Sequence, residues 1–184
     1  MSSAGDFQFD PVLSGATICV RPIRHDEFEA LYAVARDPLI WVQHPAKERS
    51  QRSVFEKWFA DALLQHGLAV EETSTRRVIG SSRYYDWNAA TREVAIGFTF
   101  ISRDHWGGQT NAQMKRLMLD HAFEWARTVW FHVGPGNTRS RKAMEKIGGV
   151  YSHTTSLGLF GAPPRDYVFY RIDAPTTKRV STSP

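Results

Sequence analysis

The stretch Phe98-Thr-Phe-Ile-Ser-Arg-Asp-His-Trp-Gly-Gly-Gln-Thr-Asn111 joins an apolar strand to a long amphipathic helix. A short polar turn separates the two, and Gly107 and Gly108 stand just before the helix. Glycine lets a backbone approach a ligand closely, and the first N–H groups of a helix lack intrahelical partners. The junction therefore favours an anion site whose geometry suits a pyrophosphate, although two such glycines could also serve only to turn the chain.

Apolar periodicity around this junction predicts one α/β domain with a mixed sheet, and 184 residues fit a single domain. Residues 1–12 are expected to form an N-terminal arm, 13–173 the domain, and 174–184 a flexible tail. On the long helix, Met114 and Met118 belong to the predicted buried face and Lys115 to the exposed face. We expect strands at Thr17–Ile23, Leu68–Glu72, Arg77–Trp87, Glu93–Ile101, Thr128–Val133, Val150–Leu159 and Tyr167–Ile172, and helices at His25–Arg36, Ser53–Gln65, Thr110–Arg127 and Asn137–Ile147.

The composition is that of a globular protein, with 42% hydrophobic and 23% charged residues. The single cysteine, Cys19, excludes a disulfide framework, and the scattered histidines do not indicate a metal site. Without a membrane-length apolar stretch or signal-peptide features, we expect a cytoplasmic protein with no membrane partner. The net charge of +4 raises nucleic acid as a partner, but the basic residues form no continuous stripe interleaved with aromatics, so we expect none.

A second motif, Asn137-Thr-Arg-Ser140-Arg-Lys-Ala-Met-Glu-Lys-Ile-Gly148, follows one predicted strand later. Together with the strand–Trp-Gly–helix junction, its pattern resembles the GNAT superfamily of acyl-CoA-dependent N-acetyltransferases. The likeness is closest to the branch that includes the ribosomal-protein N-terminal acetyltransferases (RimJ/RimL type), and it spans nearly the whole chain. It implies a single-domain GNAT fold, in which helices flank a mixed, mostly antiparallel central sheet. It also implies acetyl-CoA as co-substrate, no metal, and a homodimer as one assembly that relatives adopt.

The resemblance assigns roles in binding the co-substrate. The backbone of Phe100 and Ile101 would pair with the pantetheine arm, Asn137 would face its thioester end, and Lys142 would meet the adenosine phosphate. The pyrophosphate would be wrapped by Trp106, Gly107, Gly108, Gln109, Thr110 and Asn111. Gln109 and Asn111 depart from the Gly and Gly/Ala of the family's phosphate loop, but each still presents a backbone N–H.

The chemistry requires a neutral attacking amine, so a base or a water relayed to one must take a proton. By resemblance, Glu93 is the predicted base, with His105 and His44 as fallbacks; Glu93 could equally pair with a neighbouring arginine on the sheet surface. The backbone N–H near Ile101 is the expected donor to the developing oxyanion. Many relatives carry a Tyr acid where this chain has Met144, so Ser140 is the predicted replacement.

The acceptor pocket of the family lies between the first-helix loop and the sheet, where Trp41, His44 and Tyr84 are the predicted lining residues. Tyr85, Trp87 and Phe98 are further candidates. Such a wall would suit a small apolar or aromatic amine, or a peptide N-terminus. The sequence thus predicts an acetyl-CoA-dependent N-acetyltransferase that works by direct attack in a ternary complex, since Cys19 is remote from the junction. The alternatives are a non-catalytic acyl-CoA-binding sensor on the same fold and, less favoured, a nucleic-acid-binding module.

Overall fold

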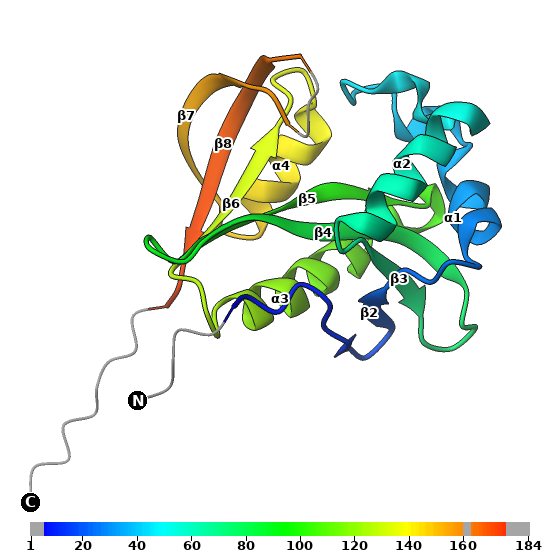
Figure 1. Cartoon of the computed structure of the whole chain (residues 1–184), viewed down its shortest axis with the longest axis horizontal. Helices are drawn as coiled ribbons and strands as arrows, with labels where there is room; N and C mark the ends of the chain where they lie inside the picture. The colour runs from blue at the N-terminus through cyan, green and yellow to red at the C-terminus, as the bar shows by residue number, and fades with distance from the viewer. Residues whose placement is uncertain (1–5, 160–162, 176–184) are drawn as a thin grey trace, which may run out of the picture.

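An eight-stranded sheet forms the centre of the protein in a computed structural model that describes residues 6–159 and 163–175 (Figure 1). In the described residues its strands are β1 (Leu13–Ser14), β2 (Ile18–Pro22), β3 (Leu68–Glu72), β4 (Val78–Asn88), β5 (Glu93–Ile101), β6 (Thr128–Val133), β7 (Val150–Leu157) and β8 (Arg165–Asp173). The helices are α1 (Phe28–Ala35), α2 (Arg52–Leu64), α3 (Thr110–Ala122) and α4 (Thr138–Lys146), with short 3-10 helices η1 (Pro38–Ile40), η2 (Lys47–Ser50) and η3 (Arg103–His105).

The strand order is β1-β2-β3-β4-β5-β6-β8-β7, and only the β5–β6 pair is parallel among the strands described. This confirms the predicted α/β fold with a mixed, mostly antiparallel sheet. The parallel pairing is short: it runs from Glu93 opposite Thr128 to Ala95 opposite Trp130. A parallel pair needs a crossover, and α3 supplies it, so α3 begins beside the end of β5.

Two apolar clusters cover the two faces of the sheet. One lies beneath α3 and α4 and contains Met114, Met118 and Met144, and the other lies beneath α1 and α2 and contains Leu31 and Phe55. Figure 1 shows α1 and α2 together beside β3 and β4, and α3 along the opposite side of the sheet. In the described part of the chain, no helix is long and apolar enough to span a membrane.

Two helices are shorter than predicted, and polar contacts hold a turn at each shortened end. The helix expected from His25 begins at Phe28, since the preceding turn is held by the bond from the Arg24 N–H to Glu27 Oε2. The helix expected to reach Arg127 ends at Ala122. Beyond that point the Arg92 side chain binds the carbonyl of Trp125 and the Arg92 carbonyl accepts from the N–H of Arg127, which fixes a turn.

Part of the predicted N-terminal arm packs into the core. Phe7 is buried against the rings of Tyr84, His121 and Trp125. Of the predicted tail 174–184, only residues 174 and 175 are among the described residues.

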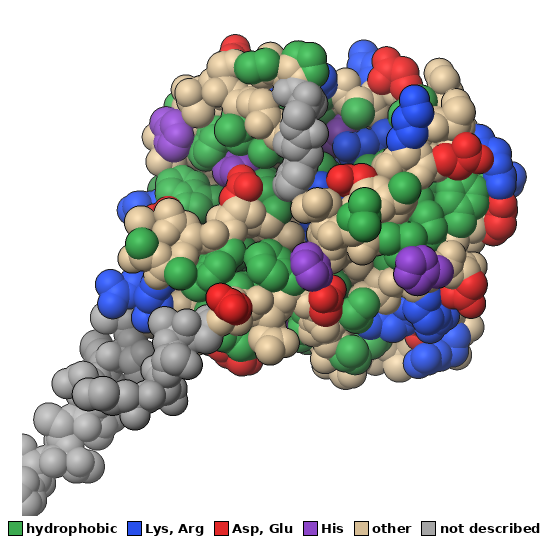
Figure 2. All heavy atoms as spheres, in the orientation of Figure 1, with side chains coloured by type: hydrophobic (Ala, Val, Ile, Leu, Met, Phe, Trp, Pro, Cys, Tyr) green, Lys and Arg blue, Asp and Glu red, His purple; other side chains and the backbone are tan. Residues whose placement is uncertain are grey.

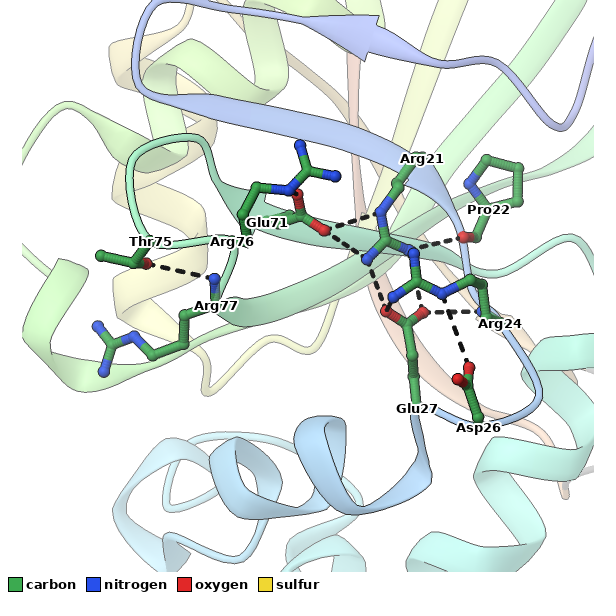
Figure 3. Close-up of polar contacts among 9 residues, drawn as sticks. All are labelled: Arg21, Pro22, Arg24, Asp26, Glu27, Glu71, Thr75, Arg76 and Arg77. Carbon is green, nitrogen blue, oxygen red and sulfur yellow. Dashed lines mark hydrogen bonds and ion pairs between the residues drawn. The ribbon is translucent and has the colours of Figure 1, made fainter.

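A buried ion network ties β2, β3 and the start of α1 together (Figure 3). Arg21 Nη2 lies 2.6 Å from Glu27 Oε1 and 2.5 Å from Glu71 Oε2. All three side chains are buried, and the more exposed Arg24 and Arg76 approach the same carboxylates from the surface. Burial opposes ionisation of Glu27, but its hydrogen bonds from Arg21 and the Arg24 N–H outweigh this and lower its pKa.

Lys115 is 2% exposed, so its predicted place on the exposed face of the helix is wrong. Its Nζ donates to Thr99 Oγ1 at 2.8 Å and lies 5.6 Å from the centre of the Phe131 ring. Burial lowers the pKa of Lys115 to about 7. The side chain turns inward because β5 supplies an acceptor, which the periodicity of α3 alone does not reveal.

We predict that Glu27→Ala lowers the free energy of unfolding by about 3–5 kcal/mol, because it leaves the buried Arg21 short of a counter-charge. Urea denaturation measures the loss. Glu29→Ala is the matched control, since Glu29 is an exposed α1 carboxylate paired with Arg52, and it should leave the stability nearly unchanged. Equal effects of the two substitutions would contradict a stabilising role for the network.

The burial of Lys115 leads to a prediction of how stability depends on pH. Its pKa is about 7 in the folded chain and about 10.4 in an unfolded chain, so between these values the unfolded state binds more protons and stability rises with pH. Relative to Lys115→Met, the wild-type free energy of unfolding should rise by about 2 kcal/mol between pH 7 and pH 9. Lys57→Met, on the exposed side of α2, should not alter the pH dependence. A wild-type-to-K115M difference that is the same at both pH values would refute the buried lysine.

Candidate active site

A cleft of about 470 Å³ opens where β5 and β6 separate, beyond Ala95 and Trp130. Its walls come from the second half of β5, the end of β6, the first turns of α3, α4 and residues 40–45. Figure 2 shows a hollow between the α2 side and the β7–β8 side of the molecule, with Lys or Arg and His side chains inside it. The cleft therefore lies at the one place in the described sheet where two neighbouring strands diverge.

The β5 wall of the cleft carries a bulge. Two steps along β4, from Ser81 to Arg83, face three steps along β5, from Phe100 to Gly97. Phe98 lies within this bulge and has a φ of 54°. A bulge takes one residue out of the regular ladder and redirects its backbone groups. The wall thus has an irregular segment from which backbone groups can reach a ligand, a feature that the sequence did not reveal.

The starts of α3 and α4 both face the cleft, but their N–H groups differ. At α4, Asn137 Oδ1 accepts from the Ser140 N–H at 3.1 Å, and Gln43 Oε1 accepts from the Arg139 N–H at 3.0 Å. At α3, Gln109 precedes the helix and makes no side-chain cap. Gly107, with a φ of 74° and open space around it, comes just before. The start of α3 is therefore the place where the cleft can accept an anion.

Arg139 and Trp106 tie α4 to the opposite wall. The guanidinium carbon of Arg139 lies 3.9 Å from the centre of the Trp106 ring, and its Nη2 donates to the Ile40 carbonyl at 2.8 Å. Trp106 Nε1 in turn donates to the Ile101 carbonyl at 3.0 Å. These contacts hold the loop before α3, the end of β5 and residues 40–45 in one arrangement.

Two histidines on the cleft have committed ring nitrogens. His105 lies between Ser102 Oγ, at 2.9 Å, and Glu72 Oε1, at 3.3 Å. His44 Nδ1 accepts from the Ala46 N–H at 2.9 Å, so its proton sits on Nε2. Burial is the main cause that lowers the pKa of His44 to about 3. Their role as fallback bases stays a prediction, and in the structure these ring nitrogens already have hydrogen-bond partners.

A third histidine, His132, is paired with a buried tyrosine. His132 Nδ1 lies 2.9 Å from the Tyr85 hydroxyl, and burial lowers the pKa of His132 to about 4. A Cβ on Gly97 would lie 2.9 Å from Tyr85 Cε1, so glycine is needed at this position for Tyr85 to reach across β5. Because a phenol can donate or accept, His132 Nε2 can present either a proton or a lone pair.

Most of the predicted site residues meet in this cleft. Trp41 lines it and is also a core residue, 2% exposed, whose Nε1 donates to the Ala35 carbonyl at 2.7 Å. Gln109 and Thr110 stand at the start of α3 without lining the cleft. The predicted residues that line it are Trp41, His44, Phe98, Phe100, Ile101, His105, Trp106, Gly107, Gly108, Asn111, Asn137, Ser140 and Lys142.

Glu93 and Tyr84 lie away from the cleft. Glu93 is in register with Asn88 and Thr128 at the start of β5, the end of the strand opposite the cleft wall. Glu93 is therefore not among the residues that line the cleft. Tyr84 is buried under α3, where its hydroxyl donates to the Met118 carbonyl at 2.8 Å, so it is a core residue and not part of the acceptor wall.

Sequence reasoning missed Lys115, His132 and Tyr167, which also line the cleft. The alternation of apolar and polar residues in β6 places His132 opposite the buried Phe131 and Val133, a signal that could have found it. No such signal exists for Lys115. In the described part of the chain, no cluster of His, Cys, Asp and Glu is arranged to hold a metal ion.

Comparison with known proteins agrees with this architecture. A probable acetyltransferase of the GNAT family from Chromobacterium violaceum ATCC 12472 is similar over 94% of this chain and 92% of its own, with 17% identity and a TM-score of 0.79. A GCN5-related N-acetyltransferase from Brucella melitensis is similar over 91% of this chain and 80% of its own, with 16% identity and a TM-score of 0.76. RimJ from Mycobacterium smegmatis, in complex with CoA-disulfide, is similar over 89% of this chain and 84% of its own, with 19% identity and a TM-score of 0.67. At these identities the likenesses show the fold.

No curated protein sequence matches the chain. The acetyltransferase (GNAT) domain family, by contrast, matches residues 17–150, which is well over half of it. That match, together with the splayed β5–β6 pair and the uncapped start of α3, assigns the chain to the GNAT family of acetyltransferases.

Proposed function

We propose that this protein is an acetyl-CoA-dependent N-acetyltransferase that transfers the acetyl group to a primary amine by direct attack in a ternary complex. The observation that carries the proposal is one continuous cleft that runs from the uncapped start of α3, through the gap between β5 and β6, to the segment 40–45. Similarity to RimJ, a neighbour that is in complex with CoA-disulfide, supports a place near the RimJ/RimL branch.

The start of α3 fits the pyrophosphate of the co-substrate. Backbone N–H groups there lack a side-chain cap, and Gly107 and Gly108 leave space for close approach. Lys142 and Lys146 on α4 line the same cleft and can meet further phosphate charge. At the opposite helix the N–H groups are taken by Asn137 and Gln43, so Asn137 acts here as a helix cap.

The co-substrate supplies an activated thioester, and the chain must stabilise charge and move protons around it. We propose that backbone groups of the bulge at Phe98 on β5 stabilise the carbonyl oxygen as it gains negative charge. Ser140 lines the cleft on α4 and is our candidate donor to the leaving sulfur. Among the described residues that line the cleft no carboxylate occurs, so we propose His132, paired with Tyr85, as the group that takes the amine's proton.

Binding of acetyl-CoA gives the first test. At about 100 times its dissociation constant it should stabilise the folded protein by about 2.7 kcal/mol, and the melting temperature should rise accordingly. Gly108→Asp is a sharp variant because the nearest atom to a Cβ there, the His105 carbonyl oxygen, is 4.0 Å away. A carboxylate at a helix start favours the free protein but repels a pyrophosphate, so this variant should keep its own stability and lose most of the ligand-induced shift. No shift in the wild type would sink the proposal.

Ser140→Ala tests the proton donor. General acid catalysis contributes about 10²–10⁴-fold, so we expect kcat to fall by about 10²-fold while acetyl-CoA affinity stays the same. Release of free CoA thiol in the presence of amines measures the rate. Ser152→Ala, on the exposed strand β7, is the control and should retain full activity. An unchanged kcat in S140A would remove Ser140 from the mechanism.

Met144 motivates the alternative function of an acyl-CoA sensor, which the same measurements test. Its side chain is 5% exposed and lines the cleft, so it offers no proton to a leaving group. Binding of acetyl-CoA, with no release of CoA from it in the presence of any amine, would favour a non-catalytic acyl-CoA sensor.

A further inference from the structure

Arg49 lies beside Trp41 and Phe98, two residues that line the cleft, and among the described residues its side chain has no ionic partner. It belongs to η2, and its guanidinium carbon lies 5.6 Å from the centre of the Trp41 ring and 5.8 Å from that of Phe98. Both rings belong to residues that line the cleft. Across the described residues, the Arg49 side chain makes neither an ion pair nor a hydrogen bond. A half-buried guanidinium with five uncommitted donors is prepared to bind an anion.

The neighbours of Arg49 add positive charge. The Arg83 guanidinium carbon lies 3.7 Å from the centre of the same Phe98 ring, and Arg83 Nη1 is paired with Asp61 Oδ2 at 2.8 Å. Asp61 is thus paired directly with Arg83 and acts on Arg49 only through its charge at a distance. Burial, and next the charge of Arg83, lower the pKa of Arg49 to about 10, so it remains a cation at neutral pH.

The positive charge of these arginines also acts on His44. Besides burial, the charges of Arg49, Arg165 and Arg139 lower its pKa. The imidazole is therefore neutral at physiological pH, with Nε2–H as a donor on the cleft. No carboxylate lines the cleft in the described chain, so a cationic ligand such as a polyamine would find no counter-charge here.

From this arrangement we infer that the acceptor amine carries its own anionic group, and that Arg49 binds it: the substrate class is a small amino acid with a free carboxylate. The inference rests on the proposed acetyl transfer and deepens it. The ring centres of Trp41 and Phe98 lie 5.6 Å and 5.8 Å from the Arg49 guanidinium carbon, and Arg49 supplies the planar pair of donors that matches a carboxylate.

Arg49 does not belong to the co-substrate end of the cleft. Phe98 precedes Ile101 by three strand residues, which is about 10 Å, and the pyrophosphate region at Trp106 lies beyond Ile101. An Arg49 variant should therefore keep its affinity for acetyl-CoA, which separates a failure of this inference from a failure of the proposed function.

The test compares matched amines with acetyl-CoA as donor and CoA thiol release as readout. The panel holds the twenty L-amino acids, their carboxamides, 1-aminoalkylphosphonates and spermidine. We expect kcat/KM for the best amino acid to exceed that of its carboxamide by about 10- to 100-fold, the range for a charge-assisted pair of hydrogen bonds. A preference for the phosphonates over the carboxylates would assign the site to phosphonate or phosphate anions instead of carboxylates.

Variants identify the residue. Arg49→Met should remove the preference for carboxylate over carboxamide, mainly by raising KM, and Arg49→Lys should restore part of it. Arg52→Met is the matched control, because Arg52 also covers two aromatic rings, Phe28 and Tyr32, but outside the cleft. Melting temperature and acetyl-CoA affinity confirm that each variant is folded.

Binding supplies a readout that does not need turnover. N-acetyl amino acids at millimolar concentration should raise the melting temperature of the wild-type protein saturated with CoA, and their amides should not. Equal turnover of carboxylates and carboxamides, a preference for spermidine, or the absence of both turnover and binding of amino acids in a protein that binds acetyl-CoA would each overturn the inference.

Discussion

The short parallel pairing of β5 with β6 is the constraint on which the site depends. After Ala95 and Trp130 the two strands part, and the facing edges of β5 and β6 lose each other as hydrogen-bond partners. Buried backbone groups need partners, so a gap of this kind is stable only where water or a ligand supplies them. Because α3 is the crossover between these two strands, its uncapped start lies at the end of β5, and the gap and the anion site arise from one topological feature.

The walls of this gap are held by side chains whose structural roles overlap with binding. Arg139 reaches from α4 to the Ile40 carbonyl, and Trp41 is a core residue and a lining residue at once. The Arg21 network, which joins β2, β3 and the residue before α1, fixes where α1 begins. α1 in turn leads into the loop that carries Trp41. The position of this end of the cleft, where we propose that the acceptor binds, thus follows from the packing of α1 and α2 as well as from the sheet.

Local patterns in the sequence were enough to predict the fold, and they also pointed to residues that the fold brings together in the cleft. The glycines before α3 and the Asn137 motif are contiguous, and their chemistry depends on backbone that they themselves shape. Tyr84 and Glu93 do not line the cleft, and the sequence carried no signal of this. Residues 78–85 of β4 are buried on both faces, so alternation cannot say which way Tyr84 points, and nothing in β5 marks the end at which it leaves β6. The arginines of the acceptor end come from β4, η2 and β8, and only the folded chain brings them together.

The positive charge at that end bears on how the amine is made reactive without a carboxylate base. The field and burial that keep His44 neutral would act in the same direction on a bound ammonium group, lowering the pKa of the amine and favouring its neutral, nucleophilic form. On its own this field would also repel a cationic acceptor. A carboxylate on the same molecule resolves the conflict, because its pairing with Arg49 offsets the cost of binding the amine in a cationic pocket. In the proposed complex the same arginines would bind the acid and favour the neutral amine, and His132 would serve as the weak base that takes the remaining proton.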